Sequence, residues 1–250
     1  MKEAVLALVA LALLTVSRPD APVERPVPFR VGETLTYDVS WSTWLTAGKV
    51  VATVRDKRPS YSSTAYYIVA EGRPTPLVGK LYSLYYKMDT LLDASTLLSQ
   101  RGSLYSEEGR RHRFRTTLFD QSARKATFEY RSSTTVRADL AVAPGVQDAL
   151  AALYVLRTLP MHAGDRLTVP VSDDGTNYRV QLDVNAPERL TVPFGTVSAW
   201  RLKPTIVDER GTALGHNLTI WLGNDPRRLP VKVLGDLPVG SFVLSLRDAR

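Results

Sequence analysis

The sequence contains no cysteine and only three histidines among its 250 residues. The absence of cysteine excludes disulfide bonds, thiolate metal ligands, a cysteine nucleophile and a lipid anchor on an N-terminal cysteine. The histidines, His112, His162 and His216, are far apart in the chain, and none has a second ligand at the spacing of a zinc motif. No G-x-S-x-G motif is present. We therefore predict no catalytic residue, no metal site and no cofactor, and we favour a protein that is not an enzyme.

The sequence also lacks a phosphate-binding loop. The segment from Gly72 to Leu81 has glycines and Lys80, but six residues instead of four separate the glycines. Leu81 stands where a Ser or Thr would bind Mg²⁺, and two prolines remove backbone N–H groups. We interpret this segment as a turn between two strands.

Long apolar runs are absent apart from one near the N-terminus, from Ala4 to Val16. This run is too short for a membrane-spanning helix, which needs about 20 residues. It matches the apolar core of a secretory signal peptide, which we place at residues 1–17. We expect a chain exported to the periplasm and released there as a soluble protein, not a lipoprotein, with no transmembrane segment after signal removal.

Charge of one sign is only modestly in excess, with 32 Lys and Arg against 25 Asp and Glu. The basic residues are dispersed and form no long polybasic tail, so we predict no nucleic-acid partner. Residues 18–29 hold four prolines among charged residues and are expected to form an extended linker. Residues 30–250 are expected to form a single antiparallel β domain.

Short segments rich in β-branched and aromatic residues recur throughout the chain, separated by Gly, Pro, Asp and Asn. They predict strands over residues 34–42, 47–56, 65–70, 81–89, 97–107, 110–120, 125–131, 133–139, 166–171, 176–185, 189–192, 195–207, 216–222, 229–234 and 239–247. In Tyr178–Val184 the even positions are apolar and the odd positions polar from residue 179 on, which indicates one inward and one outward row.

One segment differs, because residues 147–159 contain no Gly or Pro and follow helical spacing. Asp148 lies in the expected first turn, and Pro160 ends the helix. We predict a mostly-β protein: an antiparallel curved sheet, or an open β-barrel or half-barrel, with one central α-helix over 147–159 and an N-terminal signal helix. The central helix could plug the sheet, cap it, or mark a junction between two β lobes near residue 145.

The densest basic run, residues 110–115, supplies the candidate binding residues. On a strand, Arg111, Arg113 and Arg115 share one face, where guanidinium groups could bind the phosphate or carboxylate of a ligand. Tyr85 and Trp41 are candidate lining residues for the same site. The alternative is a solvent-exposed outer face.

Four further polar or aromatic residues are candidates for a structural role: Asp148, Arg157, Trp221 and Asp225. A buried guanidinium must pair with a carboxylate, so Arg157 is expected to meet Asp148 or Asp225. The turn at residues 223–226 is expected to set the register of a hairpin.

Three blocks occur in an order that resembles a known family. They are residues 32–41 (GETLTYDVSW) with Ala47-Gly48, the helix from Gln147 to Tyr154 with Arg157 and Gly164-Asp165, and Trp221-Leu222 with Asp225 and residues 227–230 (RRLP). The order resembles that of the bacterial exported proteins grouped as domain of unknown function 3108. The resemblance covers about residues 30–247. It implies a periplasmic antiparallel-β protein whose curved or barrel-like sheet can enclose a ligand, and it implies no reaction.

Two functions remain open alongside a less favoured third. The first is non-catalytic binding of an apolar or amphiphilic ligand, such as a lipid, in the concavity of the sheet. The alternative is a structural or protein-interaction module with other envelope proteins as partners. An enzyme acting on cell-wall material is less favoured, because it would need several carboxylates, or a histidine with a nucleophile, in one cleft.

Overall fold

The computed structural model describes residues 22–41, 45–61, 63–81, 83–214, 217–237 and 240–250. The expected signal peptide and His216 lie outside these ranges. The described chain forms fourteen strands and two helices. The first eight strands are β1 (Thr34–Trp41), β2 (Leu45–Ser60), β3 (Ser63–Pro74), β4 (Leu84–Asp93), β5 (Ser99–Glu108), β6 (Arg111–Asp120), β7 (Lys125–Arg131) and β8 (Thr135–Ala141). The others are β9 (Arg166–Asp173), β10 (Thr176–Val192), β11 (Gly195–Asp208), β12 (Leu218–Gly223), β13 (Pro230–Leu237) and β14 (Gly240–Ala249). The helices are α1 (Pro76–Leu81) and α2 (Ala149–Leu156).

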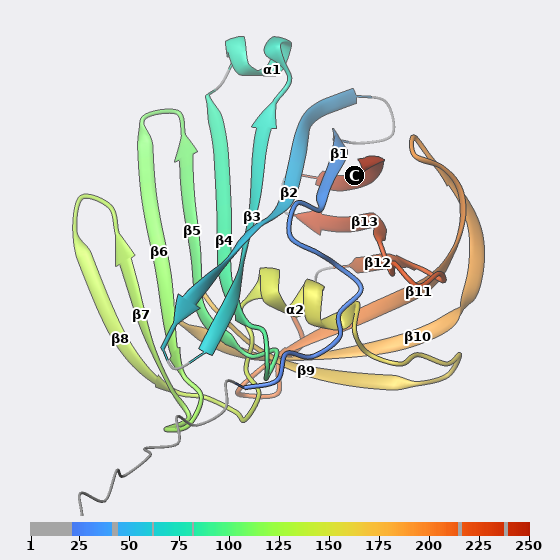
Figure 1. The fold of residues 1–250 in the computed structure, drawn as a ribbon. Coiled ribbons are helices and arrows are strands. Elements are labelled where there is room, and N and C mark those ends of the chain that lie inside the picture. Colours follow the sequence, from blue (N-terminus) through green and yellow to red (C-terminus); the bar gives the residue numbers. More distant parts are fainter. Residues whose placement is uncertain (1–21, 42–44, 62, 82, 215–216, 238–239) are drawn as a thin grey trace, which may run out of the picture.

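All fourteen strands belong to one antiparallel sheet, in the order β8-β7-β6-β5-β4-β3-β2-β1-β14-β13-β12-β11-β10-β9. The chain starts in the middle of the sheet and runs outward by hairpins to the edge strand β8. It then crosses through α2 to the opposite edge, β9, and returns by hairpins to β14, beside β1 (Figure 1). All thirteen pairs of neighbouring strands in the described sheet are antiparallel.

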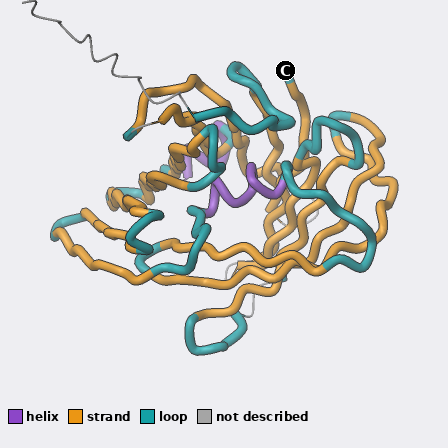
Figure 2. Tube along the Cα trace, turned by 60° about the horizontal axis from the view of Figure 1, so that its bottom comes forward, coloured by secondary structure: helices purple, strands orange, loops and turns teal. Residues whose placement is uncertain are grey.

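The sheet curls around α2 without closing into a hydrogen-bonded barrel. Figure 2 shows the helix inside the curl, with strands on several sides of it. Where the two ends of the sheet approach each other, the contacts come from side chains. The amide of Asn177, next to the β9–β10 turn, donates to the carbonyl of Ala141 at the end of β8 (2.8 Å). Arg115 on β6 pairs with Asp174 in the β9–β10 turn (3.1 Å).

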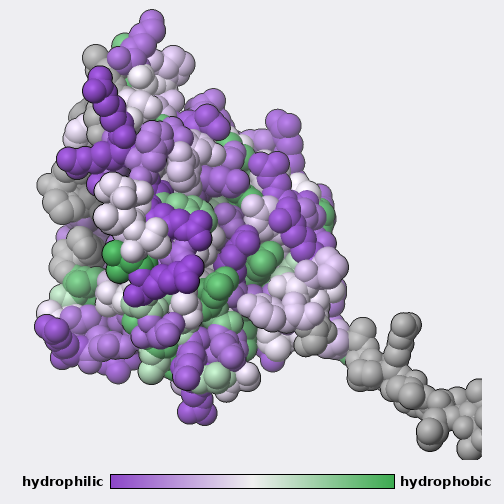
Figure 3. Space-filling model, turned by 90° about the vertical axis from the view of Figure 1, so that its left-hand side faces the viewer, coloured by the Kyte–Doolittle hydropathy of each residue, from purple (hydrophilic) through white to green (hydrophobic). Residues whose placement is uncertain are grey.

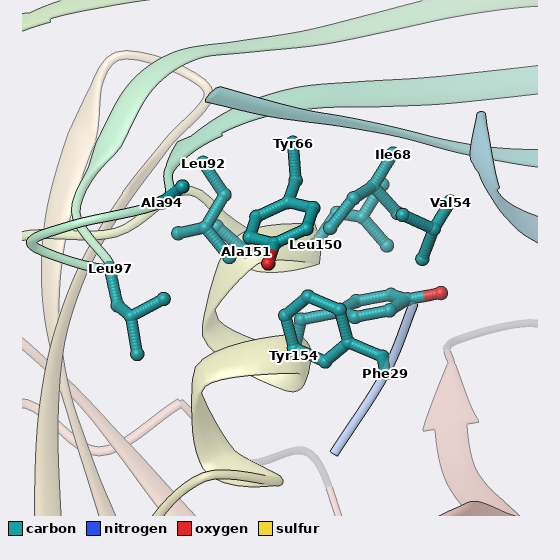
Figure 4. Close-up of a cluster of buried hydrophobic side chains, with 10 residues drawn as sticks. All are labelled: Phe29, Val54, Tyr66, Ile68, Leu92, Ala94, Leu97, Leu150, Ala151 and Tyr154. Atoms are coloured by element: carbon teal, nitrogen blue, oxygen red, sulfur yellow. The ribbon is translucent and has the colours of Figure 1, made fainter. Parts of the chain in front are cut away.

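Apolar residues of α2 pack against both halves of the sheet. In the first core cluster, Leu150, Ala151 and Tyr154 meet side chains of β2, β3 and β4 (Figure 4). Phe29 lies edge-on to the Tyr154 ring, with centroids 5.1 Å apart. On the other side, Leu156 joins a second cluster formed by β9 to β12. A helix of eight residues is short for independent stability, so these two contacts hold it in place.

The predicted fold class is confirmed: the protein is mostly β, with a curved antiparallel sheet and one central helix. The helix lies inside the curl, which corresponds to the plug among the three alternatives. It is shorter than the predicted 147–159 because Asp148 acts as its N-cap and Arg157 as its C-cap. Its N–H groups at Leu150 and Ala151 donate to the Asp148 side chain, and Gln147 is already in an extended bridge with Val171.

Two local predictions are wrong. The segment between β3 and β4 contains the helix α1, where a simple turn was expected, because Pro76 fits the first helical turn and Gly79 donates back to Thr75. The strands predicted at 176–185 and 189–192 form one strand, β10, because a register shift between Asn185 and Pro187 absorbs the proline without ending the pairing.

The end of the proline-rich segment contacts the domain. Arg25 donates its backbone N–H to the carbonyl of Ala94 (2.9 Å), and Phe29 is a buried member of the first core cluster. The expected linker at 18–29 and the domain boundary at residue 30 stay predictions.

The outer surface differs from the interior in polarity. On the side of the molecule that carries β6 to β8, Figure 3 shows mostly hydrophilic residues with small, separate apolar spots. In the described part of the chain, no helix has the length and apolar character needed to cross a bilayer.

Candidate ligand-binding cavity

The helix α2 is packed on two sides and leaves a third side open to the interior. Ala149 and Leu153, four residues apart, lie on that third side, as expected for neighbours on one helical face. Apolar cavities lie on both sides of this Ala149–Leu153 ridge. They exist because the curl of fourteen strands encloses more space than a helix of eight residues fills.

The first cavity, which we call the β10 cavity, has a volume of about 290 Å³. Its walls come from α2, from β9 to β12 and from Leu214. Asp173 is the one charged residue among its lining residues, which are Ala149, Ala152, Leu153, Leu156, Val169, Val171, Asp173, Tyr178, Val180, Leu182, Pro204, Ile206, Leu214, Leu218 and Ile220. Val180 and Leu182 belong to the apolar row predicted from the alternation in 178–184.

The second cavity, the β2 cavity, has a volume of about 350 Å³. Its lining contains no charged residue and includes three tyrosines: Leu35, Tyr37, Val50, Ala52, Ala70, Gly72, Tyr86, Met88, Ala149, Leu150, Leu153, Tyr154, Pro230, Val233 and Leu244. The Tyr37 hydroxyl donates to the carbonyl of Pro230 (2.9 Å). Burial raises the pKa of both Tyr37 and Tyr154, so their hydroxyls stay neutral.

A polar gap lies beside the N-terminal end of α2, between the two cavities. It is small, about 20 Å³, and its lining includes Ala149, Met88 and Asp173. Ala149 also lines both cavities, Met88 lines the β2 cavity and Asp173 lines the β10 cavity. Eight polar residues line this gap: Ser103, Arg115, Thr116, Thr117, Asp148, Ser172, Asp173 and Asp174. We call four of them, Arg115, Ser172, Asp173 and Asp174, the polar seam.

The N-terminal end of α2 is anchored by the buried carboxylate of Asp148. It accepts hydrogen bonds from Thr90 (2.6 Å) and Ser99 (2.9 Å), in addition to the two helix N–H groups. The chain at Gly102 passes so close that a Cβ there would lie 2.5 Å from the Asp148 Cβ. Burial raises the pKa of Asp148 to about 6, because the hydrogen bonds only partly offset the loss of solvation.

The C-terminal end of α2 is anchored by Arg157, which is almost fully buried. Its two terminal nitrogens donate to the Glu33 carboxylate (2.6 and 2.9 Å), and Nη2 also donates to the carbonyl of Arg227 (3.0 Å). The predicted pairing of Arg157 with Asp148 or Asp225 is wrong. Asp148 is at the opposite end of the helix, and Asp225 accepts from the N–H groups of Arg227 and Arg228 in its own turn.

The arginine row predicted on β6 lies on the concave face. Arg113 is opposite Ser106, which is opposite the cavity-lining Tyr86. Arg115 is likewise opposite Leu104, which is opposite Met88. Arg113 pairs with Glu108 (3.1 Å), and Arg115 pairs with Asp174, whereas Arg111 is exposed.

The other two candidate lining residues are not brought to either cavity. Tyr85 lies on the outer face, where its hydroxyl donates to Glu71 (3.0 Å) and its ring faces Arg73. Because alternate residues of a strand face opposite sides of the sheet, Tyr86 lines the β2 cavity in place of Tyr85. The predicted lining residue is therefore wrong by one position. Trp41, at the end of β1, is 45% exposed and stacks on Phe242.

Trp221, one of the four residues predicted to be structural, has polar and cationic contacts. Its indole N–H donates to Glu188 (2.6 Å), and the Lys232 ammonium lies over its ring. The indole also packs against the third core cluster. Glu188 belongs to β10 and Lys232 to β13, so Trp221 on β12 links two strands that are not neighbours in the sheet.

The lining residues of both cavities were missed by sequence reasoning. Ile220 and Val50 are ordinary sheet residues, and an alternating pattern gives the inner face of a strand but not whether that face is covered. One sequence signal could have indicated the cavities: Ala149 and Leu153, spaced i, i+4. They form a third apolar stripe on a helix that is already apolar on two sides.

The histidines of the described ranges are not clustered. His112 lies 3.0 Å from the hydroxyl of Tyr105, and His162 lies 3.4 Å from Asp165. Within the part of the chain that the structure describes, no group of three or more His, Cys, Asp or Glu could hold a metal ion.

Comparison with known families identifies the class of protein. Residues 36–247 match the family described as "Protein of unknown function (DUF3108)". The chain therefore belongs to this family, as its three sequence blocks suggested. No match is found among the curated proteins.

Solved structures share the fold at low sequence identity. A β-barrel-like protein of domain of unknown function DUF1849 from Brucella abortus has a TM-score of 0.54 and 11% identity, over 88% of this chain and 97% of that chain. A candidate exported protein with a YmcC-like fold from Bacteroides fragilis has a TM-score of 0.35 and 12% identity, over 91% and 100%. A candidate lipoprotein from Parabacteroides distasonis has a TM-score of 0.37 and 10% identity, over 90% and 98%. The first similarity supports the fold, and identities this low transfer no function.

Proposed function

We propose that this protein binds an apolar or amphiphilic ligand, without catalysis, inside its curved sheet. The observation that carries the proposal is the pair of apolar cavities beside α2, of about 290 and 350 Å³. Each lies near the lower end of the ~300–1,000 Å³ range of small-molecule sites. Burying apolar ligand surface against apolar walls is favourable by about 25 cal/mol per Å². A ligand that fills these cavities therefore stabilises the fold.

The arginine row gives the ligand site a charged border. Arg113 and Arg115 lie two strands from the cavity-lining residues Tyr86 and Met88, on the same face. An anionic group of an amphiphile could approach them while its apolar part occupies the cavity. Arg111 continues the row toward solvent.

We further propose that the protein works in the periplasm as a soluble cell-envelope protein. The support is the apolar run from Ala4 to Val16 after a single lysine and a glutamate, which suits an export signal at residues 1–17. Fractionation of the host, with the mass of the mature chain, tests this: we expect a periplasmic product that lacks about its first 17 residues. A full-length cytoplasmic chain would contradict it.

Native mass spectrometry of protein purified from its host tests the ligand proposal. We expect an additional mass in the lipid range that organic solvent removes, and the stripped protein should then take up a fluorescent fatty acid. A clean apo mass with no uptake of the fluorescent probe would contradict ligand binding.

The alternative, an interaction module, is favoured by one observation. The edge strand β8 pairs only with β7 in the described sheet, and most of its residues are exposed, with Val136 at 52%. Such an edge can accept a strand from a partner. Crosslinking in the periplasm from position 136 should capture a defined envelope protein if this function holds. A chain that stays monomeric and uncrosslinked would argue against it.

A further inference from the structure

The two cavities are separated by one short ridge of α2. Ala149 and Leu153 line both, and no other residue appears in the linings of the two. The helix is fixed at each end by buried polar contacts, at Asp148 and at Arg157. The ridge therefore lies between the two cavities, and an apolar molecule that fills both must pass over or beside Leu153.

The two compartments are alike in size and in chemistry. Their volumes differ by a modest fraction, and apart from Asp173 their linings are apolar residues and tyrosines. Each compartment suits an unbranched or lightly branched hydrocarbon chain, because the free energy of transfer depends on apolar area and needs no specific polar contact.

A single polar site adjoins both compartments. The polar gap shares Asp173 with the β10 cavity and Met88 with the β2 cavity, and all three spaces meet at Ala149. The hydroxyl of Ser172 in the seam is buried and has no hydrogen-bond partner in the described protein. Because the gap itself is only about 20 Å³, a polar group larger than a water molecule would lie over the seam and not within it.

One polar site next to two separate apolar compartments indicates the shape of the ligand. Resting on the ligand-binding function proposed above, we infer that the ligand is an amphiphile with two apolar chains and one polar head. One chain occupies the β2 cavity and the other the β10 cavity, on opposite sides of Leu153, and the head lies over the polar seam.

The charges of the seam indicate the kind of head. Arg115 offers one guanidinium, and Asp173 and Asp174 offer two carboxylates, with Arg115 and Asp174 paired at 3.1 Å. Burial next to the apolar lining, and then the neighbouring Asp174, raise the pKa of Asp173, although part of its surface stays exposed. A head that carries both an anion and an ammonium or hydroxyl donor can satisfy both kinds of side chain, whereas a bare anion would face two carboxylates.

Two matched amphiphiles test this inference: didecanoyl phosphatidylethanolamine, with two chains, and decanoyl lysophosphatidylethanolamine, with one. Stoichiometry is measured by native mass spectrometry, and affinity by displacement of a fluorescent fatty acid. Two variants each fill one compartment, Val50→Trp in the β2 cavity and Ile206→Trp in the β10 cavity. Val136→Trp adds the same side chain on the exposed strand β8, outside both cavities, and serves as the control. Circular dichroism and Tm establish that each variant folds.

The wild-type protein and Val136→Trp should bind one two-chain lipid or two single-chain lipids. Each cavity-filling variant should bind one single-chain lipid and lose at least about tenfold in affinity for the two-chain lipid, because one chain is left in water. If one single-chain lipid binds and both variants abolish its binding, the interior is one continuous site and the inference is wrong. It is also wrong if only one of the two variants has an effect. If neither lipid binds the wild-type protein, the ligand-binding function itself is wrong.

Discussion

The two ends of α2 are anchored by opposite kinds of buried charge. At the N-terminal end, the carboxylate of Asp148 is held by neutral donors, two hydroxyls and two backbone N–H groups. At the C-terminal end, the guanidinium of Arg157 meets the carboxylate of Glu33 and a backbone carbonyl. The N-terminal anchor becomes neutral when Asp148 takes up one proton. The C-terminal anchor loses its buried charges only when both Arg157 and Glu33 are replaced. We therefore expect the two anchors to respond differently to mutation and to pH.

The largest effect is expected at the C-terminal anchor. Arg157→Met leaves the Glu33 carboxylate buried without a cation, and we expect a loss of about 3–5 kcal/mol in the free energy of unfolding, measured with urea. The double variant Glu33→Leu with Arg157→Met should recover most of that loss, because no buried charge remains. Arg166→Met removes an exposed pair with Asp183 and should cost under about 1 kcal/mol. A small effect of Arg157→Met alone would show that water reaches Glu33.

The N-terminal anchor should respond to pH. The pKa of Asp148 is about 6 in the folded protein and 3.8 in a model peptide, so the folded state holds this proton more tightly than the unfolded chain. The contribution of Asp148 to stability is therefore greatest below about pH 4 and falls as the pH rises to about 6, by up to about 3 kcal/mol. Asp148→Asn keeps a side chain that can cap the helix and should remove this slope. The test is the free energy of unfolding, measured with urea from pH 4 to pH 7, for the wild-type protein and for Asp148→Asn. If this free energy changes with pH equally in the two proteins, the pKa of Asp148 is not raised.

A second buried aspartate provides the opposite pH response. Although burial alone would raise the pKa of Asp93, hydrogen bonds from Ser63, Ser95 and the backbone of Thr96 hold it at about 2. Its folded-state pKa lies below the unfolded value, so its contribution is present above about pH 4 and is lost as the pH falls toward 2. The Asp148→Asn variant should keep this acid-side loss, which makes it an internal control.

The smallest expected effect concerns the close approach at the N-terminal anchor. Gly102→Ala places a methyl group 2.5 Å from the Cβ of Asp148, and the chain or the helix must shift. We expect a loss of about 1–3 kcal/mol in stability. Gly79→Ala in α1 meets no atom closer than 3.5 Å and should be neutral or slightly stabilising. Thermal unfolding of the two variants makes the comparison; equal melting temperatures would show that the anchor tolerates movement.

The fold class was predictable because it depends on local patterns. The alternation in 178–184, the turn residues between strands and the Gly-free segment at 147–159 each predict their own element. Asp148 was predicted to lie in the first turn of the helix, whereas in the structure it is the N-cap. The N-terminal boundary of α2 was less predictable, because the extended bridge of Gln147 depends on β9, a strand that comes later in the chain.

The pairing of Arg157 and the identity of the cavity walls were not predictable in the same way. Glu33 is 124 residues from Arg157 in the sequence, and several carboxylates were equally plausible partners. Tyr85 and Tyr86 are both good strand residues, and only the register of β4 with its neighbours decides which one faces the interior. The two cavities exist because the sheet encloses more space than the side chains within it fill. No single segment of the sequence reveals that difference in volume.

The two ends of the sheet meet through side chains and not through a ladder of backbone hydrogen bonds. Arg115 with Asp174, and Asn177 with Ala141, are the polar contacts described across that junction. Separating β8 from the β9–β10 turn would break these two contacts and the approach of Phe128 to Gly175, and it would leave all thirteen described strand pairings intact. Opening the sheet along this line would therefore cost a few side-chain contacts and would leave its hydrogen-bonded strand order unchanged.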